Sequence, residues 1–323
     1  MSKETPLDNI DRVTVPPFAW NDGAGLEVAG ICNVGLVRKE NQDFMGYFEK
    51  HGDVLLVVSD GMGGHQGGYE ASRTAVAACG ELFMSSKPKI SAHKMLSDAV
   101  KLANKRIRKS SKDNPLLRGM GATVVMVLVR GAEYWLGHVG DSRAYRISEG
   151  QITQITRDHS RVQMLIDAGL LSPEKAKGHP MGHVLEFALG IDKDVEIDVS
   201  EKPFRLRDGE CLLLCSDGLW GLVEDSEIAA KLVGGDISEE GQALVDLALT
   251  RGGNDNTTVA ILRYTGDSPT DEYDSDVDTD EVETAPEFEL TEVLTDGGAA
   301  YISDLAQLVV FVVVGVAVLA AIL

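Results

Sequence analysis

Short apolar runs bounded by turn residues recur along the chain between residues 26 and 264. Runs of this kind, flanked by Gly, Asp or Asn, are typical of buried β-strands. They predict strands over 26–32, 54–59, 122–129, 133–139, 143–147, 194–199, 211–216 and 258–264. Longer segments with helical spacing of apolar residues predict helices over 67–84, 91–110, 160–169, 225–233 and 238–249.

The order of these elements bears on the fold class. The first two predicted helices follow each other directly, between two groups of strands. Such an order does not alternate strand, helix and strand, and it therefore argues against a doubly wound parallel sheet. It favours antiparallel sheets with helices packed outside.

Two of the predicted strands end in the same tripeptide. Ser59-Asp60-Gly61 follows the apolar run 55–58, and Ser216-Asp217-Gly218 follows the apolar run 212–215. Two carboxylates that converge from the ends of buried strands are unfavourable unless a positive charge lies between them. Gly after each Asp leaves the backbone free to approach an ion. We therefore expect a divalent metal at this point.

Further Asp residues lie where other apolar runs start or stop: Asp141 and Asp255 beside Gly or Asn, and Asp43 two residues after Asn41. Each one alone indicates only a turn, because Asp and Gly are common in turns. A cluster of Asp ligands without Cys or several His would select a hard cation, Mg²⁺ or Mn²⁺.

The ordered series of motifs resembles the metal-dependent Ser/Thr protein phosphatases of the type 2C, or PPM, family. Asn41-Gln42-Asp43 and Asp60-Gly61-Met62-Gly63-Gly64-His65 are in the style of its bacterial branch, and the match covers about residues 26–264. The resemblance implies an α+β fold, a four-layer sandwich of two antiparallel β-sheets flanked by α-helices. Two metal ions would lie at one end of the sandwich.

The resemblance also implies individual roles. Asp60 would bridge both metals and the Gly61 carbonyl would bind the first. Asp217 and Asp255 would hold the second, with Asp43 bound there directly or through water. Asp141 would match the acidic residue of a third, weaker metal position. Arg38 would hold the substrate phosphate, because its planar fork can meet two phosphate oxygens.

These roles describe direct hydrolysis of phosphoserine and phosphothreonine on proteins. Two divalent ions ~3.5–4 Å apart can share a water and lower its pKa toward neutrality. The resulting hydroxide would attack phosphorus in line and expel the Ser or Thr alkoxide. None of the motifs contains a Cys, so they do not indicate a phosphatase with a cysteine nucleophile.

Some positions depart from the pattern of eukaryotic relatives. Met62 stands where those relatives carry a His proposed as the general acid, so metal-bound water or His65 would have to serve instead. Gln42 replaces an acidic residue before Asp43. For His159, a structural role that pins its loop is favoured over catalysis. Segment 161–193 would form the mobile flap near the substrate.

Two alternatives stay open. A catalytically silent member could act as a regulatory or phosphoprotein-binding module, although silent members lose metal carboxylates that are all present here. A switch phosphatase acting on an anti-sigma-factor antagonist would lack the Arg that corresponds to Arg38, which this chain has.

Composition divides the 323 residues into four parts. Residues 1–21 are predicted to be a flexible arm with three Pro, and residues 22–264 the phosphatase domain. Residues 265–304 read as a disordered linker, because Asp267 to Asp296 contain thirteen acidic residues and no Lys or Arg. The linker lacks the ligand spacing of a calcium loop.

The apolar segment 305–323 predicts a transmembrane helix, since nineteen residues at ~1.5 Å each span roughly the hydrocarbon core of a bilayer. The expectation is a single-pass tail anchor with the catalytic domain on the cytoplasmic side; a buried terminal helix is the alternative. The expected partners are phosphorylated proteins, a Ser/Thr protein kinase as functional counterpart, and the membrane.

The remaining composition excludes some classes. The net charge is -21 and no basic stripe occurs, so nucleic-acid binding is not expected. Cys32, Cys79, Cys211 and Cys215 form no Cys-x-x-Cys pair, and we expect all four to be reduced and packed, with a zinc site as the weaker alternative.

Overall fold

A computed structural model of the chain describes residues 18–21, 25–87, 90–176, 179, 181–182 and 184–266. The chain divides into two units, Met1–Ser268 and Pro269–Leu323, and every described residue belongs to the first. The predicted transmembrane helix 305–323 and all but the first two residues of the predicted linker 265–304 lie outside the described residues. No helix within the described ranges is long and apolar enough to cross a bilayer.

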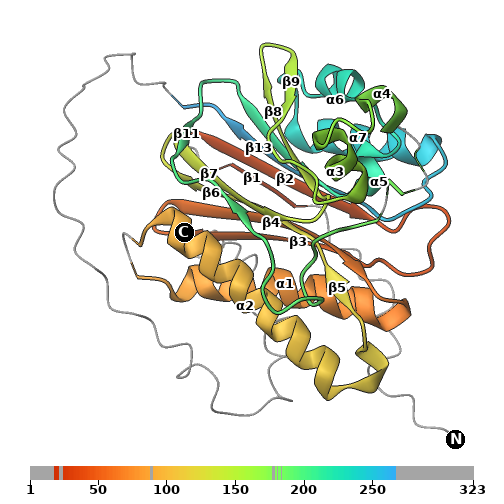
Figure 1. Ribbon diagram of the computed structural model, residues 1–323. Coiled ribbons are helices and arrows are strands. Elements are labelled where there is room, and N and C mark those ends of the chain that lie inside the picture. The colour runs from red at the N-terminus through yellow and green to blue at the C-terminus, as the bar shows by residue number, and fades with distance from the viewer. Residues whose placement is uncertain are drawn as a thin grey trace, which may run out of the picture. The chain divides into compact units, whose positions relative to one another are not determined.

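Two antiparallel sheets form the centre of the first unit (Figure 1). One sheet has the order β1 (Phe18–Asn21), β2 (Leu26–Asn33), β13 (Thr257–Tyr264), β12 (Cys211–Cys215), β8 (Arg143–Ser148) and β9 (Gln151–Gln154). The other has the order β10 (Asp198–Val199), β7 (Glu133–Val139), β6 (Val124–Arg130), β4 (Asp53–Met62) and β3 (Asp43–Lys50). The short strands β11 (Phe204–Arg205) and β5 (Gly121–Ala122) pair with β7 and β4.

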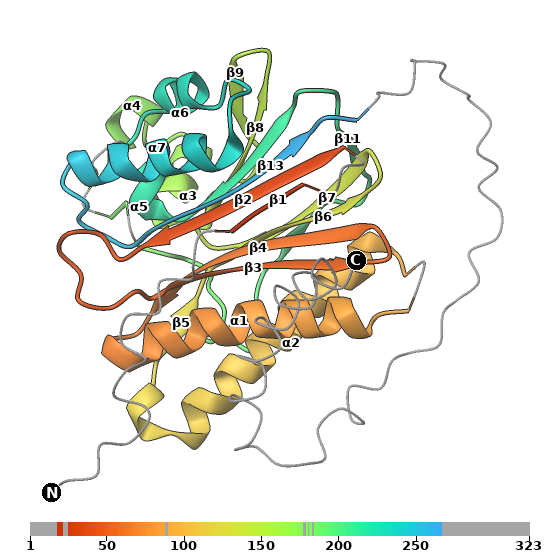
Figure 2. The same cartoon turned by 180° about the vertical axis from the view of Figure 1, so that it is seen from behind.

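Helices cover the outer faces of both sheets (Figures 1 and 2). The long helices α1 (His65–Ser85) and α2 (Ala92–Asp113) lie on the sheet that contains β3 and β4. The opposite sheet is covered by α5 (Asp217–Trp220), α6 (Asp225–Lys231) and α7 (Ile237–Thr250). The remaining helices are α3 (Arg161–Asp167), α4 (Pro173–Ala176) and the 3₁₀ turn η2 (Pro115–Leu117). The predicted sandwich of two antiparallel sheets with flanking helices is therefore confirmed.

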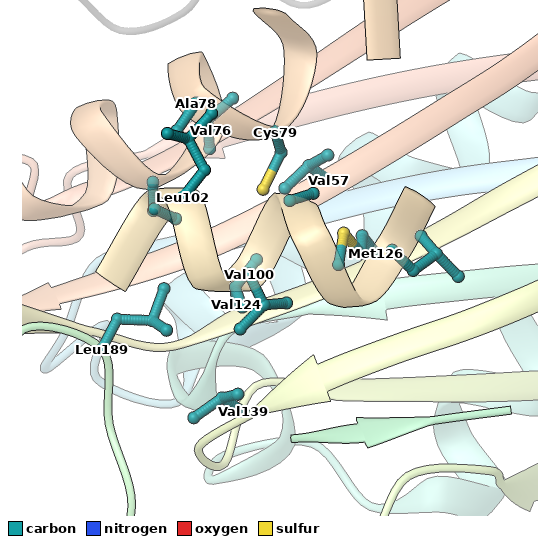
Figure 3. Close-up of a cluster of buried hydrophobic side chains, with 14 of the residues drawn as sticks. Val57, Val76, Ala78, Cys79, Val100, Leu102, Val124, Met126, Val139 and Leu189 are labelled. Carbon is teal, nitrogen blue, oxygen red and sulfur yellow. The ribbon is translucent and has the colours of Figure 1, made fainter. Parts of the chain in front are cut away.

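Side chains alternate between the two faces of each strand, and this alternation divides the buried apolar residues into three layers. Leu55 and Val57 of β4 pack with α1 and α2, whereas Leu56 and Val58 face the other sheet. Figure 3 shows the layer under the helices, where Val57 lies near Cys79 of α1 and Val100 of α2. Because successive strand residues point to opposite faces, a strand that is apolar throughout can serve two layers at once.

Several elements differ from the sequence-based expectation. Strand β1 lies inside segment 1–21, for which we predicted a flexible arm, and it pairs with β2 over Phe18–Asn21. Strands β3 and β9 were not predicted. The strand predicted over 194–199 is reduced to the two residues of β10. The helix predicted over 160–169 ends as α3 at Asp167.

The directions of the strands bring the predicted metal-binding aspartates to one end of the sandwich. Asp43 begins β3 and lies opposite Asp60, near the end of β4, in the strand register. The strand β12 ends just before Asp217, and β13 begins just after Asp255. In an antiparallel pair one strand begins at the end of the sheet where its neighbour finishes. The residues at these strand ends therefore meet at one end of the sandwich.

Candidate metal centre

The five predicted aspartates gather at this end of the sandwich. Asp43 and Asp141 are buried, with exposed fractions of 4% and 5%, and the other three are half-buried. The other four carboxylates, those of Asp43, Asp141, Asp217 and Asp255, all lie close enough to Asp60 to raise its pKa by repulsion. The sequence prediction that carboxylates from distant stretches meet at one place is therefore matched by their positions.

Burial and mutual repulsion act on these carboxyls in the same direction. Burial raises the pKa of Asp43 to about 7, and the carboxylates of Asp217 and Asp255 add to the shift. Burial, with repulsion from Asp217 and Asp158, raises the pKa of Asp141 to about 8. The pKa of Asp60 is raised well above its ordinary value by burial and by its acidic neighbours. Such a cluster favours a cation among the carboxylates.

The donor set fits a hard divalent cation. All five side chains offer carboxylate oxygens, with no Cys and no His among them, which suits Mg²⁺ or Mn²⁺. The Oδ1 atom of Asp43 is buried and receives no hydrogen bond. A buried carboxylate oxygen without a donor is costly unless a cation lies beside it.

The aspartates do not form the tightest ligand group in the described part of the chain. That group is His138, His159 and Asp198, whose ligand atoms all lie within 4.8 Å of one another. The Gly140 N–H lies 3.3 Å from Nδ1 of His159, and Nε2 of His159 lies 3.2 Å from Asp198 Oδ2. This pattern places the ring proton on Nε2, so we interpret the group as a hydrogen-bonded support for the loop that precedes Asp141. The role agrees with the pinning function predicted for His159.

Arg38, the predicted phosphate-binding residue, lies at the same end. Its Nη2 atom is 2.6 Å from Oδ2 of Asp255, and its side chain is half exposed. The backbone before it is fixed by a hydrogen bond from the Leu36 N–H to the Gly253 carbonyl, 2.8 Å long. The positively charged guanidinium of Arg38 is partly exposed to solvent and lies beside the carboxylates, so it is well placed to bind an anionic substrate.

Close packing of backbone segments also requires the glycines of the two Ser-Asp-Gly tripeptides. We expected them to let the backbone approach an ion. A Cβ on Gly61 would lie 1.9 Å from the carbonyl oxygen of Gly68 in α1, and one on Gly218 would lie 1.9 Å from the carbonyl oxygen of Asn256. Glycine is therefore required at both positions because another backbone segment passes so close.

Sequence reasoning missed two polar residues that hold the site together. The Asn256 side chain donates to the carbonyls of Val34 and Glu40, at 2.9 and 3.0 Å, and accepts the Gln42 N–H at 2.8 Å. It thereby fixes the loop that carries Arg38. Thr123 accepts the Asp60 N–H at 2.9 Å and donates its own N–H to the Asp60 carbonyl at 2.8 Å.

The backbone at Asp141 is fixed from the other side by Trp220. The indole is only half-buried, and its N–H donates to the Asp141 carbonyl at 3.0 Å. The guanidinium of Arg143 stacks 3.7 Å above its ring and pairs with Asp158.

The side chain of His65, a candidate general acid, lies outside the described part of the structure.

The comparisons with known proteins agree with one another, because every match described below is a protein phosphatase. The family model described as Protein phosphatase 2C matches residues 37–235. The serine/threonine protein phosphatase PstP of Mycobacterium tuberculosis is 37% identical over 237 residues, which are 73% of this chain and 44% of that protein. The serine/threonine phosphatase stp of Listeria monocytogenes is 35% identical over 71% of this chain and 92% of that protein.

A solved structure agrees in fold. The catalytic domain of the serine threonine protein phosphatase PstP in complex with two manganese ions superposes with a TM-score of 0.64 at 34% identity. The match covers 75% of this chain and 99% of that one. The chain thus spans less than half the length of the mycobacterial relative but nearly all of its catalytic domain.

Proposed function

Because the chain belongs to the protein phosphatase 2C family, we propose that it is a serine/threonine protein phosphatase that hydrolyses phosphoserine and phosphothreonine on proteins. The observation that carries the proposal is the meeting of five carboxylates at one end of the sandwich, beside an open arginine. The named relatives, which are serine/threonine phosphatases, support the same activity.

Residues of this chain would hold two Mn²⁺ or Mg²⁺ ions, in line with the two manganese ions of the related PstP structure. When bound, such ions supply an activated water and neutralise charge on the phosphate. We propose that Asp60 and the Gly61 carbonyl hold the first ion and that Asp60, Asp43, Asp217 and Asp255 hold the second. Asp141 would serve a third, weaker position.

Arg38 would bind and orient the phosphate. Its guanidinium has five N–H donors, more than the bond to Asp255 uses. Because the side chain is half exposed, a phosphorylated side chain can reach it from solvent. Two parallel hydrogen bonds to phosphate oxygens would hold the group in one orientation during attack.

The activity is tested on the full chain with p-nitrophenyl phosphate and a phosphothreonine peptide in the presence of Mn²⁺. We expect hydrolysis of both, and loss to background in EDTA and in Asp60→Asn, because the bridging carboxylate is gone. Asp113→Asn, an exposed residue at the end of α2, is the matched control and should behave as the unaltered chain. Undiminished hydrolysis by Asp60→Asn would overturn the assignment, and absence of hydrolysis by the unaltered chain would favour a silent binding module.

We also propose that segment 305–323 spans a membrane and holds the phosphatase domain near membrane-bound partners, including a Ser/Thr protein kinase. The support is the length and apolar character of the segment. Tethering raises the effective concentration of two proteins at one surface. The full chain should sediment with membranes after a high-salt wash, and a chain ending at residue 304 should not. Equal release of both proteins would contradict this part of the proposal.

A further inference from the structure

The two oxygens of the Asp43 carboxylate have different surroundings. Oδ2 accepts a hydrogen bond from the Ser216 hydroxyl at 2.6 Å and another from the Thr258 hydroxyl at 2.8 Å. Oδ1 is buried but receives no hydrogen bond. The protein therefore uses one oxygen of this carboxylate for its own hydrogen bonds and leaves the other without a donor.

Each hydroxyl has only one proton to donate. The donor and acceptor of every hydrogen bond can therefore be assigned, starting at Asp43 and moving away from it. The Ser216 hydroxyl accepts the Thr258 N–H at 3.0 Å, which leaves its proton for Asp43. The Thr258 hydroxyl lies 2.9 Å from the thiol of Cys32, its cross-strand neighbour in the register of β13 and β2. An ionised carboxylate can only accept. Thr258 therefore donates to Asp43, and the Cys32 thiol donates to Thr258.

Asn41 completes the chain of hydrogen bonds. Its Nδ2 donates to the Cys32 sulfur at 3.0 Å, and its Oδ1 accepts the Asp43 N–H at 3.1 Å. Asn41 thus contacts both Asp43 and Cys32. The sulfur accepts from Asn41 while its proton points to Thr258, and the whole network is buried or half-buried.

We propose that Thr258, Ser216 and Cys32 are positioning residues that fix the Asp43 carboxylate so that Oδ1 alone is presented to the metal ion. Asp43 then contributes this one oxygen to the metal centre, directly or through a bound water. This inference rests on the proposed function, because it assigns the orientation of one carboxylate of the same site.

Two physical effects follow from the arrangement. Two O–H donors on Oδ2 stop rotation about the bond that carries the carboxylate, so little freedom is lost when a cation binds Oδ1. They also favour the ionised form that a metal requires. Hydrogen-bonded partners of metal ligands commonly change metal affinity about 10- to 100-fold when removed.

The test measures Mn²⁺ binding to the full chain by electron paramagnetic resonance, in which the signal of free Mn²⁺ falls on binding. Thr258→Val keeps the size of the side chain but removes the donor, and we expect Mn²⁺ affinity to fall roughly 10-fold or more. Thr258→Ser restores the hydroxyl and should recover most of the affinity. Thr250→Val, at the exposed end of α7, is the control and should bind as the unaltered chain does.

The second pair of variants tests the outer part of the network. Cys32→Ser keeps a donor toward Thr258 and should bind Mn²⁺ nearly normally. Cys32→Ala removes the donor, and we expect a smaller loss of roughly fivefold, the effect of one hydrogen bond. Thermal unfolding of each variant without metal separates a general loss of stability from a specific loss of affinity.

Two outcomes would overturn the inference: Thr258→Val binding Mn²⁺ as tightly as Thr258→Ser, or Thr258→Ser failing to recover affinity at unchanged thermal stability. Failure of the proposed function looks different, because Asp60→Asn would then bind Mn²⁺ and hydrolyse phosphate esters normally. If Asp60→Asn abolishes both while Thr258→Val alters neither, the phosphatase assignment stands and the positioning role is wrong.

Discussion

At the scale of single residues, the Asn256 side chain joins segments that are distant in the sequence. It holds the carbonyls of Val34 and Glu40 and the N–H of Gln42, and it is buried, with an exposed fraction of 4%. Asn256→Ala leaves three backbone groups without their partner, so we expect the free energy of unfolding to fall by about 2–4 kcal/mol. Urea denaturation measures the change. Asn254→Ala, exposed on the same loop, should have little effect, and an equal loss there would contradict the argument.

His138 makes the stability depend on pH. Burial, helped by the neighbouring His159 and opposed by Asp198, Asp158 and a hydrogen bond to the Gly140 carbonyl, lowers the pKa of His138 from 6.5 to about 4. Its pKa in the folded chain lies below its unfolded value, so the unfolded chain binds more protons between these pH values. Stability from this residue is therefore present above the unfolded pKa and is lost as pH falls toward 4.

We accordingly expect the unaltered chain to lose about 2 kcal/mol more stability than His138→Gln when the pH is lowered from about 7 to about 5. Urea denaturation at several pH values in that range, without metal, measures the difference between the two proteins. His93→Gln, an exposed histidine on α2, is the control and should keep the pH dependence of the unaltered chain. Parallel pH profiles for the unaltered chain and His138→Gln would contradict this prediction.

At the scale of elements, one buried ion pair attaches α7 to the sheet beneath it. Glu240 of α7 pairs with Arg263 of β13, and its other oxygen accepts three backbone N–H groups from Val233 to Gly235. Glu240→Gln removes the more buried of the two carboxylates that pair with Arg263, the other being Glu27, so we expect a loss of about 3 kcal/mol in urea denaturation. Glu239→Gln, the exposed neighbour, should change the stability by less than about 0.5 kcal/mol. Similar values for both variants would show that the pair contributes nothing.

Some features could be predicted from a short stretch of sequence, whereas others depend on segments that are distant along the chain. Strands β4 and β12 were predicted because nearly every residue is apolar and buried. Strand β3 was missed because its sequence, DFMGYFEK, mixes half-buried and exposed positions and contains Gly46, whose space is filled by Val76 of α1 and Phe48. The five aspartates were found from their places beside turns. The partners of Asp43 were not, because Ser216 and Thr258 reach it only through the pairing of strands that are far apart in sequence.

At the scale of the whole molecule, the three apolar layers and the candidate metal centre are complete within the described residues up to Gly266. A chain ending after Gly266 should therefore fold, with a melting temperature within about 3 °C of the full chain. A chain ending after Asn256 keeps all five aspartates but lacks β13, whose eight residues are all buried between β2 and β12. We expect it not to fold, as measured by circular dichroism and thermal melting. A cooperative melt of the shorter chain would contradict the prediction.

The central place of β13 also sets when the domain can fold during protein synthesis. Its partner β2 lies near the other end of the domain, with Leu26 opposite Tyr264. A sheet whose middle strand is translated last cannot close while the ribosome is still making that strand, and contacts between such distant segments form slowly. The sheet therefore stays open until residue 264 has emerged, and an interrupted message yields a polypeptide whose domain cannot close.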